Sequence, residues 1–236
     1  MVQTGDLGYR DGGETLNGVF AWDAAQPGRR PGILVVHGGA GLDDHARGRA
    51  RRFAESGFVA FACDMYGESV KGNRERVVQH IGELRRNRDT LVRRAQGAID
   101  ALAAHPQVDG RLAAVGYCFG GMVVLELARA GVDFNGVVSV HGSLETMRQA
   151  EPGAIKSRIL VCHGALDPHV PMAQVAAFTE EMNRVGADYQ LIVYGGAMHG
   201  FTHEAAVTPA NGVAYHAPTD VRSARAIRTF FDETFA

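Results

Sequence analysis

One cysteine of this chain lies in a sequence context that suits a nucleophile. The motif Gly116-Tyr117-Cys118-Phe119-Gly120-Gly121 follows an apolar run at 112–116 and opens a segment with helical periodicity. A strand, a tight glycine turn and a helix in this order hold a nucleophile above a sheet, and the glycines avoid collisions with neighbouring chain. The helix N-terminus favours a thiolate at Cys118. The alternative is a buried cysteine at a tight turn.

An acid and a base follow Cys118 at the ends of two later apolar runs. Asp167 comes directly after the run 158–164, and His199 comes just beyond the run 191–194. In proteins with open parallel sheets, the binding or active site lies just beyond the carboxyl ends of the strands. We therefore predict Cys118 as nucleophile, His199 as base and Asp167 as the acid that orients it. The alternatives are a turn or cap residue for Asp167 and a backbone-bonded loop imidazole for His199.

A glycine-rich segment can supply part of an oxyanion hole. His37-Gly38-Gly39-Ala40-Gly41 follows the first central apolar run. We predict the N–H groups of Phe119 and Gly39 as the two donors. A phosphate loop is a weaker interpretation, because no Lys-Ser/Thr follows and the GxGxxG spacing is absent. His37 is predicted to be structural.

Alternating apolar runs and helical patterns predict the scaffold. Strands are expected at 33–37, 58–63, 112–116, 136–141, 158–164 and 191–194, and helices at 45–56, from Thr90 to Pro106, at 119–130, 172–185 and 220–235. Strands joined by crossover helices form right-handed βαβ units and a sheet covered on both faces. The predicted class is the α/β-hydrolase fold: one domain over 1–236, with a doubly wound, mostly parallel sheet flanked by helices and no large cap domain.

Three further segments are assigned from turn signals and polarity. Gly12-Gly13 and Asn17-Gly18 predict turns around antiparallel edge strands near Val19 to Trp22. Residues 67–88 are polar and Arg-rich and contain no strand pattern. Residues 203–219 form a predicted long loop directly after His199, and long loops in compact domains are often functional.

Composition excludes several classes of function. Apolar residues make up 46% of the 236, charged residues 21%, and the formal net charge is -2, so the chain is globular and has no general attraction to nucleic acid or anionic membrane. Arginines near 47–52 and 85–94 lack aromatic partners and are interpreted as solvated helix faces. No signal peptide pattern and no apolar run of membrane-spanning length occurs, which predicts a cytoplasmic protein.

The remaining cysteines and histidines suggest no metal. Cys63 and Cys162 end apolar strands and are predicted as small buried hydrophobes, and three cysteines without a CxxC pair form no disulfide framework. His163 and His169 flank Asp167, but no recognised ligand spacing accompanies them. We predict neither a metal nor another cofactor.

These residues resemble the dienelactone hydrolase family, whose signature is GYC-x-GG at a cysteine elbow, followed by Asp and His. The resemblance runs from Gly32 to Phe231, and Cys63–Gly67 and Ala197–Phe201 are similar to two further family segments. It implies a hydrolase of lactones and activated esters without metal or organic cofactor. We expect a monomer or homodimer acting on a small-molecule ester or lactone.

The resemblance also implies substrate contacts, with two departures. Gly38 stands where the family carries a Glu that contacts the resting thiol, and His203 stands where it carries an Arg for the substrate carboxylate. Arg76, one of several arginines between 74 and 88, matches the family's second Arg. The predicted substrate-binding residues are therefore Arg76, Gly38, Tyr117 and His203.

The predicted reaction is ester or lactone hydrolysis through a thioester on Cys118. A thiolate favours good leaving groups, so enol lactones and aryl esters are expected substrates. We hypothesise activated phosphotriesters as a secondary class, because the same oxyanion hole accepts a phosphoryl oxygen. The alternatives are a thioesterase or peptidase on the same three residues, and a non-catalytic scaffold or thiol redox sensor.

Overall fold

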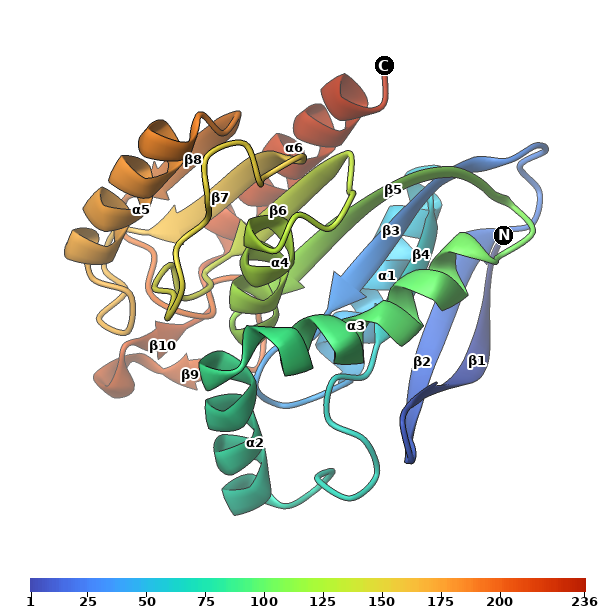
Figure 1. Cartoon of the computed structure of the whole chain (residues 1–236), viewed down its shortest axis with the longest axis horizontal. Helices are drawn as coiled ribbons and strands as arrows, with labels where there is room; N and C mark the ends of the chain where they lie inside the picture. The colour runs from blue at the N-terminus through green and yellow to red at the C-terminus, as the bar shows by residue number, and fades with distance from the viewer. The chain divides into compact units, whose positions relative to one another are not determined.

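The computed structural model describes residues 1–236 and contains two compact units, Met1–Val115 and Gly116–Ala236. The elements of the first unit are β1 (Val2–Asp11), β2 (Glu14–Asp23), β3 (Arg30–Val36), α1 (Asp44–Glu55), β4 (Val59–Cys63), α2 (Arg74–Arg86), α3 (Arg88–Ala103) and most of β5 (Val108–Tyr117) (Figure 1).

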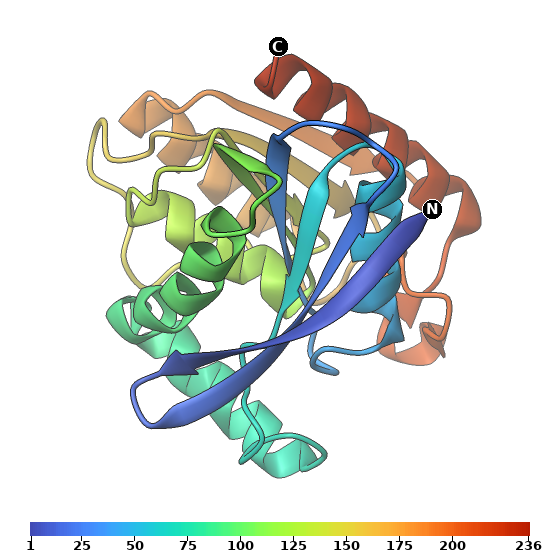
Figure 2. The same ribbon diagram turned by 90° about the vertical axis from the view of Figure 1, so that its right-hand side faces the viewer.

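The first unit is a mixed sheet covered by helices. Its strand order is β1-β2-β4-β3-β5, with β3 and β4 parallel and β1, β2 and β4 joined antiparallel. The strands β3 and β4 are buried along their whole length, as expected of apolar runs covered on both faces. Helices α1 and α3 both contact β3 and β4, and Figure 2 shows them on opposite sides of these strands.

The N-terminal hairpin differs from the sequence prediction at one of its two expected turns. The chain turns at Gly12-Gly13, as predicted, but Asn17 and Gly18 lie inside β2, which pairs with β1 over ten residues (Figure 2). Gly18 is required there by packing, because a Cβ at this position would come within 2.2 Å of the Phe61 ring. The glycine of Asn17-Gly18 therefore marks a close approach between β2 and β4, and the predicted turn was wrong.

The polar, Arg-rich stretch contains a helix that the sequence analysis did not assign. Helix α2 begins after Asn73, whose side chain accepts a hydrogen bond from the Arg76 N–H, and buries only Leu84. With so little apolar surface to bury, its sequence lacks the wide apolar stripe that identifies a core helix.

The second unit carries a parallel sheet. Its elements are α4 (Phe119–Arg129), β6 (Gly136–Val140), β7 (Arg158–Gly164), α5 (Met172–Val185), β8 (Tyr189–Tyr194), β9 (Val207–Thr208), the 3₁₀ helix η1 (Pro209–Asn211), β10 (Val213–Ala214) and α6 (Ala217–Thr234). Strands β6, β7 and β8 are neighbours in that order and parallel, and both α4 and α6 contact β6. Their carboxyl ends therefore meet at one edge. No helix of the chain combines the length and apolarity needed to cross a bilayer.

The predicted loop after His199 contains short ordered elements. Strands β9 and β10 pair antiparallel around η1, and helix α6 begins at Ala217 instead of the predicted 220. His199 donates its N–H to the Gly212 carbonyl, and its own carbonyl accepts from the Ala214 N–H. The backbone around His199 is thus fixed by this segment.

Candidate active site

Cys118 occupies a strained turn between β5 and α4. Its φ and ψ are 54° and −113°, a combination that residues other than glycine rarely adopt. A Cβ at Gly116 would lie 1.9 Å from the Gly120 carbonyl oxygen, and one at Gly121 would lie 2.7 Å from Ser139 Oγ. The spacing of the glycines in the motif therefore follows from how tightly α4 packs against the turn and β6.

Three predicted residues lie in a hydrogen-bonded line in the second unit. His199 Nε2 is 3.0 Å from Cys118 Sγ, and His199 Nδ1 is 2.8 Å from Asp167 Oδ2. Cys118 is half-buried, whereas Asp167 is 4% exposed. Each residue follows a different strand, β5, β7 or β8, so the parallel sheet brings together side chains that are far apart in sequence.

The two carboxylate oxygens of Asp167 have different partners: one accepts backbone N–H groups and the other contacts His199. Oδ1 accepts the N–H groups of His169 and Val170 at 2.8 and 3.1 Å, which shapes the turn ahead of α5. Oδ2 is left to His199. Burial alone would raise the pKa of Asp167, but these hydrogen bonds outweigh it and hold that pKa below its ordinary value. Asp167 is therefore a turn residue, and its role as the acid that orients His199 stays a prediction.

The surroundings of His199 favour its charged form. Burial disfavours the imidazolium, but the hydrogen bonds to Asp167 and Cys118 outweigh it and raise the pKa of His199 to about 10. A negative charge on the sulfur of Cys118 also raises the pKa of His199, so the pair favours imidazolium and thiolate together. An imidazolium partner favours a thiolate over a thiol.

The match with known families covers almost all of the chain. The model of the dienelactone hydrolase family matches residues 16–235, which crosses both units. This chain belongs to the dienelactone hydrolase family. Its predicted fold class, the α/β-hydrolase fold with a mostly parallel sheet flanked by helices, is confirmed by structures of related proteins. The single domain over 1–236 that the sequence predicts stays a prediction.

Several proteins are similar to this chain in sequence or in structure. A dienelactone hydrolase-like promiscuous phosphotriesterase from metagenomic libraries is 40% identical, with a TM-score of 0.94 over 99% of this chain and 98% of that one. A probable 2-oxo-3-(5-oxofuran-2-ylidene)propanoate lactonase of Bradyrhizobium is 26% identical, covering 75% of each chain. An uncharacterised protein of Caenorhabditis elegans is 38% identical over 61% of this chain and 93% of its own length.

One residue in contact with the site of this dienelactone hydrolase-family chain was not singled out from the sequence. His141 directly follows β6, and its Nδ1 accepts the Cys118 N–H at 3.1 Å. Its Nε2 lies 2.9 Å from Thr202 Oγ1. Its position in the sequence could have indicated this contact. His141 ends the apolar run 136–141, and this strand ends at the same edge of the sheet as the strands before Asp167 and His199.

Two more histidines surround the Asp167–His199 pair. His163 is buried at the end of β7, and burial lowers its pKa. His169 is exposed; its ring stands edge-on to His199 with centroids 5.3 Å apart, and its Nε2 lies 2.8 Å from the Asn211 carbonyl oxygen. The contacts of His169 are those of a structural residue, whereas His163 Nε2 is buried without a hydrogen-bond partner, and the absence of a metal here stays a prediction.

The other predicted site residues of the second unit lie near the elbow or the His199 loop. Tyr117 and Phe119 flank Cys118 and are buried, with the Tyr117 ring 6.1 Å from that of His141. His203 is half-buried and donates its N–H to the Gly200 carbonyl at 2.8 Å. Their contacts with substrate stay predictions.

The remaining predicted site residues belong to the first unit. The carbonyl oxygens of Gly38 and Gly39, after β3, lie 3.4 and 3.2 Å from the Tyr66 hydroxyl. The guanidinium of Arg76 is exposed at the start of α2 and donates to the Ser69 carbonyl at 2.8 Å. The roles of Gly38, Gly39 and Arg76 stay predictions. His37 is buried, and its Nε2 accepts the Met65 N–H at 3.0 Å, as a structural residue would.

The two other cysteines differ from Cys118 in burial. Cys63, at the end of β4, and Cys162, inside β7, are fully buried, and none of the three cysteines forms a disulfide. Burial raises the pKa of the Cys162 thiol to about 12 and that of Cys63 further still. The prediction of small buried hydrophobes is confirmed for both, so a thiol reagent should distinguish them from Cys118.

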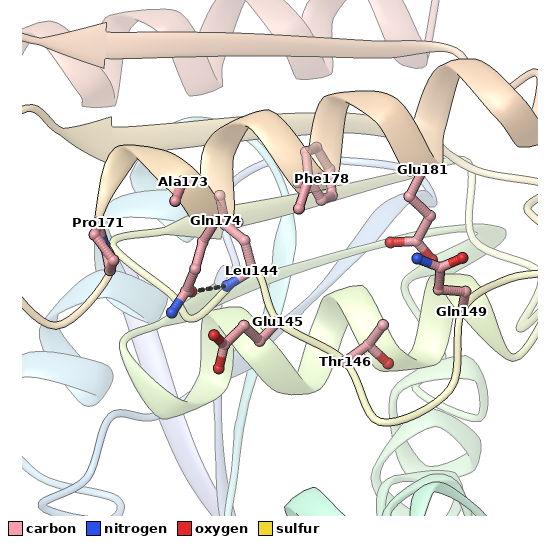
Figure 3. A pocket seen from close by; sticks show the side chains of 10 residues that line it. Leu144, Glu145, Thr146, Gln149, Pro171, Ala173, Gln174, Phe178 and Glu181 are labelled. Atoms are coloured by element: carbon pink, nitrogen blue, oxygen red, sulfur yellow. Dashed lines mark hydrogen bonds between the residues drawn. The ribbon is translucent and has the colours of Figure 1, made fainter.

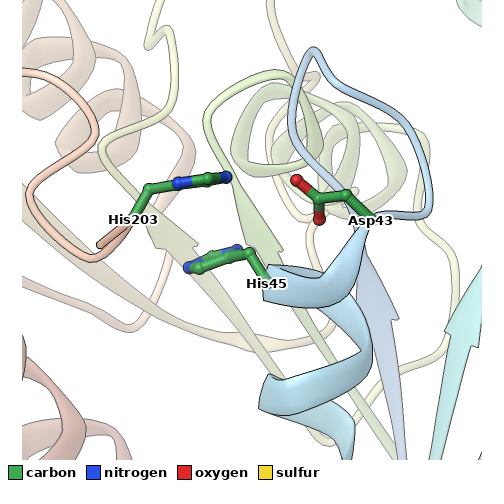
Figure 4. A group of neighbouring side chains, drawn as sticks. All are labelled: Asp43, His45 and His203. Carbon is green, nitrogen blue, oxygen red and sulfur yellow. The ribbon is translucent and has the colours of Figure 1, made fainter. Parts of the chain in front are cut away.

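Figure 4 draws Asp43 and His45, at the start of α1, together with His203 from the second unit. Asp43 caps α1 by accepting the Ala46 N–H at 3.0 Å. His45 Nε2 accepts from Arg49 Nε at 3.2 Å. These are ordinary structural roles for a carboxylate and an imidazole at a helix start, and the absence of a functional metal stays a prediction.

Prolonged dialysis against a chelator should leave hydrolysis of an aryl ester unchanged. The predicted nucleophile, base and acid contact one another directly, so none of them needs a metal to be activated. Initial rates before and after dialysis, with the metal content measured in parallel, check this. Lost activity that an added divalent cation restores would show that the enzyme is metal-dependent.

A separate cavity of about 290 Å³ lies between α5 and residues 144–149 (Figure 3). Phe178 and Leu144 give it an apolar wall, and the Leu144 N–H faces Gln174 Oε1 at 3.4 Å. Glu181 at its far end is already bound by the buried Arg129 guanidinium. Cys118, Asp167 and His199 are not among its lining residues.

Proposed function

We propose that the protein hydrolyses activated esters and lactones through a Cys118–His199–Asp167 triad. The observation that carries the proposal is the continuous line from sulfur to imidazole to carboxylate, with separations of 3.0 and 2.8 Å. A nucleophile, a base and an orienting acid within hydrogen-bond distance are the parts that acyl transfer requires.

In the proposed mechanism, Cys118 attacks the carbonyl carbon as a thiolate. The N–H groups of Phe119 and Gly39 are the proposed donors to the oxygen that becomes negative. The His199 imidazolium protonates the leaving alkoxide, which leaves a thioester on Cys118 and a neutral imidazole. Neutral His199 then removes a proton from water, and the hydroxide formed releases the acid and restores the thiolate.

Asp167 supports both steps without exchanging a proton. Its Oδ2 accepts from the Nδ1–H of His199, which keeps Nε2 directed at the sulfur. The same contact stabilises the imidazolium, consistent with the raised pKa of His199.

The relatives support lactones as substrates, with phosphotriesters as a secondary class. The Bradyrhizobium protein is described as a probable lactonase, and the metagenomic structure as a promiscuous phosphotriesterase. A phosphotriester presents a phosphoryl oxygen to the same donors and carries an aryl leaving group that a thiolate can displace. Gly38 and His203 replace charged family residues, so we propose that neutral substrates are accepted.

A substrate panel separates this proposal from its alternatives. Purified protein would be assayed on a neutral lactone, a carboxylated lactone, an aryl ester, a thioester, a peptide and an aryl phosphotriester. The proposal expects the highest kcat/KM on the lactones or the aryl ester. A clear preference for the thioester or the peptide would favour those activities instead, and no turnover of any substrate would favour a scaffold or a redox sensor.

Iodoacetamide should alkylate Cys118 readily at about pH 6, well below the ordinary thiol pKa of roughly 8.5. His199 remains protonated up to about pH 10, so lowering the pH to 6 does not remove the cation that favours the thiolate. In His199→Ala the rate at pH 6 should fall at least about tenfold, because the sulfur loses that partner. The alkylation rate against pH, followed by intact-protein mass, is the measurement.

Cys63 and Cys162 provide an internal control for the alkylation. Both are fully buried and should stay unmodified in the folded protein, so a single adduct is expected. A wild-type curve with its midpoint near the free-thiol value would show a protonated resting cysteine, and attack by a preformed thiolate would have to be abandoned.

A further inference from the structure

His141, directly after β6, is held in an uncommon conformation inside the protein. Its φ is 41°, a positive value that is uncommon for residues other than glycine, although histidine adopts it more often than most, and the residue is 2% exposed. Its backbone N–H donates to the Cys162 carbonyl at 2.9 Å, which ties it to β7. Strained residues of this kind cluster at functional sites.

Both nitrogens of the His141 ring engage groups from the site. The Cys118 N–H donates to Nδ1 at 3.1 Å, and Nε2 lies 2.9 Å from Thr202 Oγ1. A backbone N–H can only donate, so Nδ1 carries no hydrogen, and Nε2 carries it and donates to the Thr202 hydroxyl. One rigid ring therefore joins the turn that carries the nucleophile to the loop that carries the base.

The ring also packs against the base itself. The centroids of His141 and His199 are 5.3 Å apart with the planes at 61°, and Phe201 stands edge-on to His141 at 5.0 Å. His141 thus contacts the backbone of one reacting residue and the side chain of the other.

We propose that His141 is a positioning residue that sets the separation of Cys118 Sγ and His199 Nε2; this rests on the proposed function of that pair. The Cys118 backbone, at φ 54°, is held by two acceptors of its N–H, the Val140 carbonyl at 3.0 Å and His141 Nδ1. Without the second acceptor the turn can relax. A misplacement of about 1 Å between reacting groups lowers rates by as much as roughly 100-fold.

Two substitutions separate positioning from backbone strain. His141→Gly relieves the positive φ but removes the acceptor, and His141→Asn tolerates the positive φ and keeps an acceptor oxygen close to the place of Nδ1. We expect the Gly variant to lose about tenfold in kcat on an aryl ester with KM unchanged, and the Asn variant to lose no more than about threefold. The rate of Cys118 alkylation at pH 6 should follow the same order.

Thr202 gives an independent pair of variants should His141→Gly fail to fold. Thr202→Val keeps the shape and removes the acceptor of the Nε2–H, so kcat should fall about threefold, whereas Thr202→Ser should retain wild-type kcat. In the His141→Asn background, Thr202→Val should add no further loss, because Asn is too short to occupy the position of Nε2.

Wild-type kcat and alkylation rate in His141→Gly, or in Thr202→Val, would overturn the proposal. So would a rise in KM at unchanged kcat, which would make His141 a substrate contact. Alkylation of Cys118 needs no ester substrate. Failure of the proposed ester hydrolysis can therefore be distinguished from failure of the proposed role of His141. A wild-type protein that turns over no ester refutes the proposed function, while the alkylation rates still test what His141 does to Cys118.

Discussion

Replacing Cys118 with Ala is expected to reduce aryl ester turnover by at least about 10³-fold while leaving the fold intact. The substitution removes the sulfur that lies 3.0 Å from His199 Nε2 and no other atom of the residue. Alanine also keeps the Cβ, so the strained turn meets no new backbone constraint. Steady-state kinetics of the variant, with circular dichroism and thermal unfolding as checks on folding, give the measurement.

Cys162→Ala is the matched control for this substitution. Cys162 is fully buried inside β7, and its Sγ lies 3.9 Å from the Tyr194 hydroxyl. Its replacement should cost stability through a lost buried sulfur but leave kcat close to that of the wild type. Full ester hydrolysis by Cys118→Ala would end the assignment of the nucleophile.

Replacing Asp167 with Asn is expected to lower kcat/KM by about 10²-fold, less than the loss of Cys118. An amide N–H at the Oδ2 position would face the Nδ1–H of His199, so the imidazole would change tautomer or rotate. The effect is smaller than for Cys118, because a thiolate forms in part without the acid.

The same variant should change the pH dependence in a defined direction. Asp167 favours the protonated form of His199, whose pKa is about 10, so its removal lowers that pKa. The alkaline decline of kcat/KM, where the imidazolium loses its proton, should therefore move to lower pH. Asp188→Asn, at an exposed ion pair with Arg158, is the control and should keep the wild-type profile. A wild-type rate in Asp167→Asn would mean that another carboxylate orients His199.

The sheet and the line of three residues could be predicted because both follow from local patterns. All six apolar runs predicted as strands are strands, from β3 to β8. Since parallel strands end at one edge, the positions of Cys118, Asp167 and His199 just after three of them were enough to expect their meeting. The glycines around Cys118 were a further signal, because a Cβ at Gly116 or Gly121 would collide with neighbouring atoms.

The parts that the sequence analysis missed depend on tertiary contacts. Gly18 indicates a turn by its type, but it is needed because the Phe61 ring of another strand lies against it. Helix α2 buries only Leu84, so its sequence contains little apolar periodicity. His141 follows a strand, as many other residues do, and only the folded backbone, with its positive φ, turns the ring toward Cys118.

The most direct test of the central claim is detection of the thioester itself. Wild-type protein and Asp167→Asn would be mixed with an activated aryl ester, quenched in acid within milliseconds to seconds, and examined by intact mass and peptide mapping. We predict one acyl group on the peptide that contains Cys118, formed at a rate no slower than turnover and absent from Cys118→Ala. Turnover without any acyl-protein, or an acyl group on another residue that persists in Cys118→Ala, would contradict the proposed mechanism.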